Sequence, residues 1–260
     1  MLNKKIVAFD LDGTLTESKQ PLQKEMAEVL MTLANQKKVV IISGGSYGQF
    51  QTQFLSVWRK FTATLPLEEA LKINKNLYLL PTSGCQIFHY DETQNDWQIL
   101  AQEKLSEEFE TKAKEALDFV IKSDQFEISA ESFGPRVEDR GAQVTFSALG
   151  QEAPLDKKKV WDPDQKKRLK IKAKLEEMIP EVDISIGGAT SIDILPKGFN
   201  KAVGLQKLLN LLLEEKSDLI FVGDALFPGG NDYSMHEAGF ATIKVGGPTE
   251  TKQLIESWLK

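Results

Sequence analysis

The chain has 260 residues, of which 41% are hydrophobic and 27% are charged, and its formal net charge is −6. This length accommodates one large or two modest domains with a substantial core, and the negative balance argues against general binding to nucleic acid or acidic membranes. The sequence holds a single cysteine, Cys85, and no apolar run near the roughly 20 residues that span a bilayer. Its first apolar run ends at Asp10, too early for a secretory signal. A soluble cytoplasmic protein is therefore expected.

Two aspartates follow that first apolar run, residues 6–9. Four apolar residues in succession, bounded by charged ones, predict a buried parallel strand. Asp10 and Asp12 then stand at its carboxyl end, with Thr14 close behind. Ligands of open α/β sheets collect beyond this end of the strands, so the pair is a candidate for chemistry. The alternative is an Asp-Gly turn with an incidental second aspartate.

Strand and helix patterns alternate through the rest of the first 80 residues. The expected elements are a helix over 22–33, a strand over 39–42, a helix from 46 or 47 to 60, and a strand over 77–80. This order predicts a doubly wound, Rossmann-like α/β core with a parallel sheet and right-handed crossovers. Ser43 and Gly44 follow the second strand, so they belong to the same sheet edge as Asp10. Residues 86–90 and 97–100 indicate a hairpin, where the parallel order stops.

The middle of the chain has a different pattern. It predicts a helix over 105–121, strands over 126–133 and 142–149, a lysine-rich helix ending at 179, and strands over 182–186 and 191–195. Without βα alternation, these elements favour an α+β insertion. We therefore expect a core of residues 1–85 and 190–260 and an inserted domain of residues 86–189. The lysines could indicate nucleic-acid binding, but the acidic residues among them favour a solvated helix face.

Core elements resume near residue 200. Asn200 is an expected N-cap for a helix that begins near Lys201, and strands over 219–222 and 241–245 precede a final helix over 254–259. The edge residues are then mostly oxygen donors around one lysine: Asp10, Asp12, Ser43, Asp224, Asn231 and Asp232. Oxygen donors of this kind suit Mg²⁺. Two isolated histidines and one cysteine argue against a zinc site. These residues could also have purely structural roles. In that interpretation Ser43 ends a strand, Lys201 starts a helix and Asp232 caps a turn.

Four motifs in this order resemble the haloacid-dehalogenase superfamily of phosphotransferases. They are Asp-Leu-Asp-Gly-Thr-Leu-Thr at 10–16, Ile-Ile-Ser-Gly-Gly-Ser at 41–46, Lys201, and Gly-Asp-Ala-Leu-Phe-Pro-Gly-Gly-Asn-Asp at 223–232. The last motif, together with Gly-Gly-Ala-Thr-Ser-Ile-Asp-Ile at 187–194, resembles the eukaryotic-type phosphomannomutase branch. The resemblance implies that the insertion is a C2-type (subclass IIB) cap, which selects the substrate.

The resemblance also implies roles for the core residues. Asp10 would be the nucleophile that forms an aspartyl-phosphate, and Asp12 the general acid and later the general base. Mg²⁺ would be held by Asp10, the backbone carbonyl of Asp12, and Asp224, with Asp232 in support. Charge on the phosphoryl group must be offset. The residues expected around it are Lys201, Thr14, Ser43, Gly44 and Asn231.

In the cap, the phosphomannomutase branch uses arginines to hold a distal phosphate. Arg140 matches one of them and Arg136 is a candidate for a second, while Ser191 and Asp193 match the pair that contacts sugar hydroxyls. Gln151 stands where the mutases have another arginine, and glutamine carries no charge.

Three functions follow as alternatives. The first is a Mg²⁺-dependent phosphatase acting on a sugar phosphate, and the second is a mutase interconverting mannose 6-phosphate and mannose 1-phosphate. The third, a catalytically silent binding module, is disfavoured because all four motifs keep their reactive residues. The partner expected is a small sugar phosphate, and the branch also implies a homodimer formed through the cap.

Overall fold

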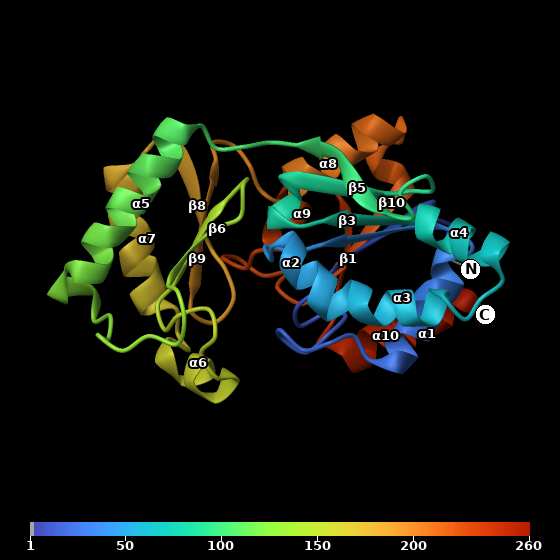
Figure 1. Cartoon of the computed structure of the whole chain (residues 1–260), viewed down its shortest axis with the longest axis horizontal. Coiled ribbons are helices and arrows are strands. Elements are labelled where there is room, and N and C mark those ends of the chain that lie inside the picture. Colours follow the sequence, from blue (N-terminus) through green and yellow to red (C-terminus); the bar gives the residue numbers. More distant parts are fainter. Residues whose placement is uncertain (1–2) are drawn as a thin grey trace. The chain divides into compact units, whose positions relative to one another are not determined.

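The computed structural model describes residues 3–260, which divide into two compact units (Figure 1). The core comprises residues up to 102 and residues 200–260, and the cap comprises residues 103–199. Both boundaries differ from the expected 85/86 and 189/190. The hairpin strand β4 (Gln86–Asp91) pairs with β3 of the core sheet, whereas β9 (Ser191–Pro196) pairs with β7 and β8 of the cap sheet. Hydrogen bonding between strands therefore assigns the hairpin to the core and β9 to the cap.

The core contains a seven-stranded sheet with the order β11-β10-β1-β2-β3-β4-β5. The remaining strands are β1 (Ile6–Asp10), β2 (Lys38–Ile42), β3 (Leu77–Leu80), β5 (Asp96–Gln102), β10 (Leu219–Gly223) and β11 (Ala241–Lys244). The five strands from β11 to β3 run parallel, and β4 and β5 add an antiparallel hairpin. The predicted α/β fold with a parallel sheet is confirmed.

Helices cover both faces of this sheet, which explains why its central strands β1, β2, β3 and β10 are buried along almost their whole length. They are α1 (Lys24–Ala34), α2 (Tyr47–Gln49), α3 (Ser56–Thr62), α4 (Leu67–Lys75), α8 (Lys201–Leu212), α9 (Tyr233–Glu237) and α10 (Pro248–Leu259). Val7 and Phe9 of β1 pack in one hydrophobic cluster with α1, α3 and α10. Ile6 and Ala8 pack in a second cluster with α8. Alternate residues of one strand thus support opposite layers.

The helices of the core differ from the sequence-based expectation in three places. The helix expected from 46 or 47 to 60 contains a π-helix, η1 (Phe50–Leu55), between α2 and α3. The pattern missed α4, a helix with only two buried residues, Ile73 and Asn74. The last helix begins at Pro248, six residues before the expected start, because proline fits the first helical position.

The cap contains a four-stranded antiparallel sheet with the order β6-β7-β9-β8. Its other elements are α5 (Glu107–Lys122), β6 (Val137–Asp139), β7 (Val144–Ser147), α6 (Leu155–Trp161), α7 (Lys166–Met178) and β8 (Val182–Ile186). Phe146, Ile192 and Ile194 on one face of the sheet pack with buried residues of α5 and α7 in the cap core. The expected α+β insertion is therefore present as a separate unit.

The strand predicted over 126–133 is wrong. Residues 124–126 form a 3₁₀ turn, and residues 127–136 contain no strand. The guanidinium group of Arg136 donates to the carbonyl oxygens of Ser129 and Glu131, so a side chain satisfies acceptors that a strand would give to a neighbour. The apolar residues of this segment, on which the prediction rested, could not reveal that a side chain would bind its carbonyl groups.

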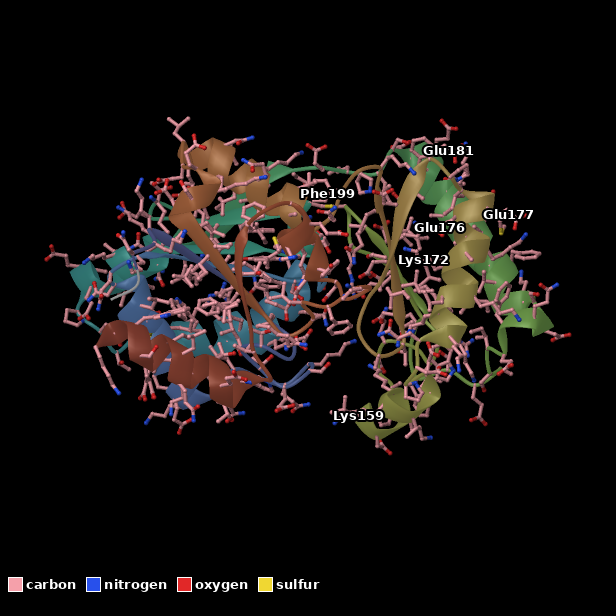
Figure 2. All side chains as sticks on the ribbon, turned by 180° about the vertical axis from the view of Figure 1, so that it is seen from behind. Lys159, Lys172, Glu176, Glu177, Glu181 and Phe199 are labelled. Atoms are coloured by element: carbon pink, nitrogen blue, oxygen red, sulfur yellow. The ribbon has the colours of Figure 1, made fainter. Side chains whose placement is uncertain are left out.

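The lysine-rich helix α7 carries charges of both signs (Figure 2). Lys172 lies 3.4 Å from Glu176 and Lys174 lies 3.0 Å from Glu177, at spacings that place each pair on one side of the helix. This pairing fits the solvated-face interpretation of the lysine run. Among residues 3–260, no helix combines the length and apolar character needed to cross a membrane.

Candidate active site

Polar residues follow three neighbouring strands of the core sheet. Asp10 is the last residue of β1, Ser43 follows β2, and Asp224 follows β10. Strand β1 lies between β2 and β10, and all three run parallel. Their carboxyl ends therefore meet at one edge, where ligands of such sheets bind.

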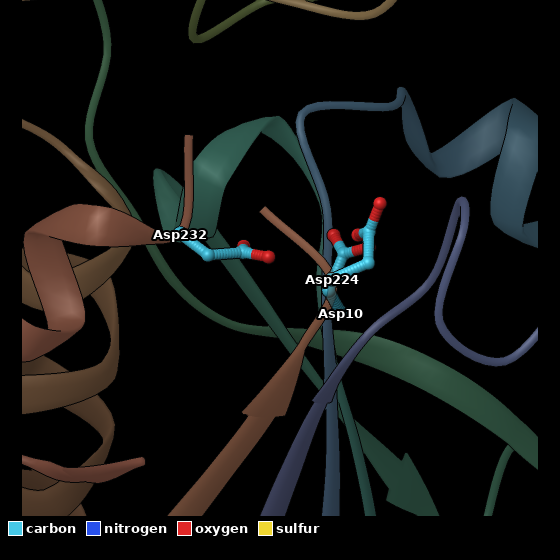
Figure 3. A group of neighbouring side chains, drawn as sticks. All are labelled: Asp10, Asp224 and Asp232. Carbon is cyan, nitrogen blue, oxygen red and sulfur yellow. The ribbon is translucent and has the colours of Figure 1, made fainter. Parts of the chain in front are cut away.

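Three carboxylates gather at this edge (Figure 3). One oxygen atom from each of Asp10, Asp224 and Asp232 lies within 4.8 Å of the others. Asp232 directly precedes α9, and its carboxylate points towards those of the other two aspartates. Asp10 is 3% exposed and Asp232 is fully buried. This buried group of carboxylates could hold a metal ion.

Lys201 joins two of these carboxylates. Its Nζ lies 2.5 Å from Oδ1 of Asp10 and 2.7 Å from Oδ1 of Asp232. The residue is the first of α8, where the side chain of Asn200 accepts a hydrogen bond from the amide of Val203 as the predicted N-cap. Burial alone would lower the pKa of Lys201, but Asp10 and Asp232 outweigh burial and raise it. The lysine therefore stays charged.

One lysine does not balance three aspartates. Burial raises the pKa of Asp10 well above its usual range, and Lys201 opposes this change only in part. Burial and the neighbouring Asp232 also raise the pKa of Asp224. A cation bound among these oxygens would stabilise their charged forms. The donor set consists of hard oxygen atoms, which suits a divalent cation such as Mg²⁺.

The loop after β1 fits closely around Asp224. Thr14 donates from Oγ1 to Oδ1 of Asp224 over 3.2 Å and accepts from the Asp224 amide over 3.1 Å. Gly13 has a φ of +90°, and a Cβ atom there would lie 2.6 Å from Oδ2 of Asp224. Glycine is therefore required for conformation and for space. Thr14, predicted to bind phosphate, uses its hydroxyl group to hold the Asp224 loop.

Asp12 stands apart from the three clustered carboxylates. Its Oδ1 accepts hydrogen bonds from the Lys19 amide over 2.6 Å and from Nε2 of Gln53 over 2.7 Å. Gln53 is buried within the π-helix η1. Sequence reasoning missed this residue, although a glutamine between the buried Phe50 and Phe54 was a signal that its amide needs a partner.

The Ser43 loop is supported by a turn that follows β3. The amide of Ser83 donates to the carbonyl oxygen of Ser43 over 2.9 Å, and that of Thr82 donates to the carbonyl oxygen of Gly45 over 2.8 Å. Within the loop, Oγ of Ser43 accepts from the Gly45 amide over 3.1 Å. Gly44 follows and is partly exposed, and Asn231 is exposed beside Asp232.

In the cap, both predicted arginines are engaged within the unit. Arg136 donates to backbone carbonyl groups, including that of Ala148 over 3.1 Å. Arg140 pairs with Oε2 of Glu138 through Nε over 3.0 Å and through Nη2 over 2.7 Å. Glu138 was not anticipated, because its spacing from Arg140 has no special meaning outside the local fold.

Ser191 and Asp193 alternate along β9 with residues of the cap core, so they share the other face of the sheet. Thr145 lies opposite Asp193 and donates to its Oδ1 over 2.8 Å. The contact between Thr145 and Asp193 was not predicted, because only the register between β7 and β9 places the two residues opposite each other. The amide nitrogen of the Gln151 side chain is buried and makes no hydrogen bond within the described part of the chain.

The sequence of this chain is similar to one protein family and to phosphomannomutases. A family model described as haloacid dehalogenase-like hydrolase matches residues 7–241. A phosphomannomutase of Encephalitozoon cuniculi (strain GB-M1) is 26% identical over 271 residues, covering 99% of this chain and 94% of the relative. A phosphomannomutase of Schizosaccharomyces pombe is 29% identical over 242 residues, covering 89% of this chain and 85% of the relative.

Solved structures support the fold independently. A C-terminally truncated IMP-nucleotidase of Plasmodium falciparum has a TM-score of 0.74 at 18% identity, covering 99% of this chain and 72% of that chain. A haloacid dehalogenase-like hydrolase of Bacteroides thetaiotaomicron has a TM-score of 0.56 at 15% identity, covering 98% and 99%. At these identities the likeness concerns the fold alone.

Proposed function

The chain belongs to the haloacid dehalogenase-like hydrolases, and we propose that within this family it is a Mg²⁺-dependent phosphatase that acts on a sugar phosphate. The observation that carries this proposal is the buried arrangement of Asp10 and Asp232 around Lys201, with Asp224 alongside. Such a group combines a carboxylate nucleophile with positive charge for a phosphoryl group.

Asp10 is the proposed nucleophile. One of its oxygen atoms attacks phosphorus, the bond to the leaving oxygen breaks, and Asp12 gives that oxygen a proton. Asp12 then takes a proton from the water molecule that attacks the aspartyl-phosphate, which releases inorganic phosphate and restores Asp10. General acid–base catalysis of this kind typically contributes about 10²- to 10⁴-fold.

Lys201 holds Asp10 in place through the hydrogen bond between Nζ and Oδ1. Mg²⁺ would be held by Asp10, Asp224 and the carbonyl oxygen of Asp12, and it would supply positive charge against the phosphoryl oxygens. Asp232 would act in support, since it accepts from Lys201 and from the Ala225 amide. The proposed phosphate contacts of Ser43, Gly44 and Asn231 belong to the same edge.

The cap is proposed to select the substrate, with Ser191 and Asp193 binding hydroxyl groups of the sugar. The state of the cap arginines favours a phosphatase over a mutase. A mutase must hold a bisphosphate in two orientations and therefore needs charge for a second phosphate. Arg140 is already paired with Glu138, the Arg136 guanidinium group binds backbone carbonyls, and Gln151 is neutral. A phosphohexomutase remains the second candidate, favoured by the phosphomannomutases that align along nearly the whole chain.

A paired assay separates the two functions. The chain is incubated with Mg²⁺ and mannose 6-phosphate or mannose 1-phosphate, with and without a hexose 1,6-bisphosphate primer, and free phosphate and isomer are both measured. Free phosphate without a primer requirement is the expected result, and it should disappear in Asp10→Asn. Isomer that forms only with the primer, without free phosphate, would identify a mutase instead. A panel of other sugar phosphates then tests the choice of sugar.

A further inference from the structure

We propose that Gln53 is a positioning residue that fixes which oxygen of Asp12 carries the proton during catalysis. This inference rests on the proposed role of Asp12 as general acid and base. Gln53 lies in the π-helix η1, and this form of helix is rare and often occurs at functional sites.

The hydrogen bonds around Asp12 distinguish its two oxygens. The Lys19 amide at 2.6 Å and Nε2 of Gln53 at 2.7 Å both donate to Oδ1. In the described part of the chain, no residue donates a hydrogen bond to Oδ2. A proton on Oδ1 would compete with two N–H donors, whereas a proton on Oδ2 would not. The arrangement therefore reserves Oδ2 for proton transfer.

Gln53 is itself held in one orientation. It is 5% exposed, and its Nε2 also donates to Oγ1 of Thr16 over 2.9 Å. Its backbone carbonyl oxygen accepts from the Leu22 amide over 2.8 Å, which connects the π-helix to the segment that follows the first motif. Burying an amide is unfavourable unless it is hydrogen-bonded. Here both N–H groups of the buried amide donate hydrogen bonds to the loop that carries Asp12.

The test uses two phosphate esters that differ in their need for an acid. A sugar phosphate releases an alcohol oxygen that must be protonated, whereas p-nitrophenyl phosphate releases a stable phenolate. The ratio kcat/KM reports steps up to formation of the aspartyl-phosphate, and in these steps the reaction at phosphorus differs between the two esters only in the leaving oxygen. Contacts of the cap with the sugar are the same in parent and variant, so they cancel when each ester is compared between the two. Gln53→Leu should lower kcat/KM about 10- to 100-fold for the sugar phosphate and less than about threefold for p-nitrophenyl phosphate.

Gln51→Leu is the matched control, since Gln51 lies in the same π-helix and accepts from Nη1 of Arg59 over 2.8 Å instead. It should affect both esters equally and little. If Gln53→Leu does not fold, as judged by thermal melting, Gln53→Met offers a flexible side chain of similar length without the donor. Equal losses on the two esters, or no loss, would overturn the inference by reducing Gln53 to a structural or neutral residue.

The parent chain and Asp10→Asn are measured first. If the parent chain turns over neither ester, or if its turnover does not depend on Asp10, the proposed function and this inference are both overturned. A parent with such turnover establishes the reaction, and the ester comparison in Gln53→Leu then decides the inference alone.

Discussion

The core and the cap both bury charged side chains, but they balance them differently. In the cap, Arg168 meets Asp162 one to one, with Nε 2.8 Å from Oδ2. Asp162 also accepts from the amides of Lys167 and Arg168, each over 3.0 Å. In the core, Lys201 is the one basic residue of the described chain that pairs with Asp10 and Asp232, and Asp224 lies nearby. The charges of the cap pair balance each other, whereas the core group has an excess of negative charge.

The pKa directions follow this difference. Burial alone would raise the pKa of Asp162, but the hydrogen bonds from Arg168 and from the backbone outweigh it, so that the pKa is lowered. The pKa values of Asp10 and Asp224 are raised. Charge that is fully paired serves the fold, whereas charge kept in excess serves a ligand at the expense of stability. Each prediction below tests one side of this contrast.

The largest expected effect is on turnover. Asp10→Asn removes the proposed nucleophile and should lower kcat/KM by about 10³-fold or more. The side chain keeps its shape and the crowding of carboxylates is relieved, so the midpoint of thermal unfolding should change little. Steady-state kinetics and thermal melting of the same preparation check both parts. Turnover close to that of the parent would contradict the mechanism.

Asp162→Asn should have the opposite profile, because it breaks a complete ion pair and leaves Arg168 buried without its counter-charge. We expect a loss of about 3–5 kcal/mol in the free energy of unfolding of the cap. Denaturant unfolding followed through the fluorescence of Trp161, beside this pair in the chain, measures it. Asp164→Asn is the control, since Asp164 pairs with Lys166 at the surface and should contribute little.

The cost of Asp162→Asn should also depend on pH. The pKa of Asp162 is lowered in the folded chain, so its stabilising effect is present above the unfolded value of about 3.9. It is lost as pH falls through the folded pKa, which lies lower. The difference in unfolding free energy between parent and Asp162→Asn should therefore shrink only below about pH 4. A difference that already shrinks near neutral pH would show that another group titrates.

Mg²⁺ should stabilise the core and leave the cap unchanged. Binding at 100 times the dissociation constant adds about 2.7 kcal/mol, which thermal melting at increasing Mg²⁺ concentration would detect. Asp224→Asn should reduce this gain, because it removes one of the three clustered carboxylates. Asp183→Asn in the cap, where Asp183 pairs with Lys197, is the control and should keep it. An equal gain in both variants would place the cation elsewhere.

The main features of the core site follow from the sequence because apolar runs end in polar residues. Parallel topology then brings Asp10, Ser43 and Asp224 to one edge without any knowledge of side-chain contacts. The partners of these residues are harder to foresee. Gln53 reaches Asp12 from a π-helix, and Glu138 neutralises Arg140 through local geometry. Neither contact leaves a periodic pattern in the sequence.

The domain boundaries illustrate a second limit. The alternation of apolar and polar residues in the hairpin strand β4 does not show whether the strand belongs to the core or to the cap. Only its pairing with β3 assigns it to the core. The strand wrongly expected over 126–133 had suitable apolar residues, but Arg136 binds the carbonyl groups there. Pairing partners, and not local preference, decide such segments.

The smallest expected effect concerns how the core holds Lys201. Gly204, in the same helix, packs against the turn after β3, and a Cβ atom at this position would lie 2.7 Å from Cα of Gly84 and 2.7 Å from the carbonyl oxygen of Ser83. Gly204→Ala should therefore cost about 1–3 kcal/mol of stability. It should also lower kcat several-fold, since α8 and the Ser43 loop both rest on this turn.

Gly48→Ala provides the matched control, because Gly48 is also helical and its added Cβ would meet nothing closer than 3.7 Å. That substitution should be neutral or stabilising by up to about 1 kcal/mol. Thermal melting and kcat are measured for both variants. If Gly204→Ala lost stability but kept the parent's kcat, the contact with Gly84 would support folding alone, like the buried ion pair of the cap. A loss of both would show that this backbone contact also holds Lys201 in register with Asp10.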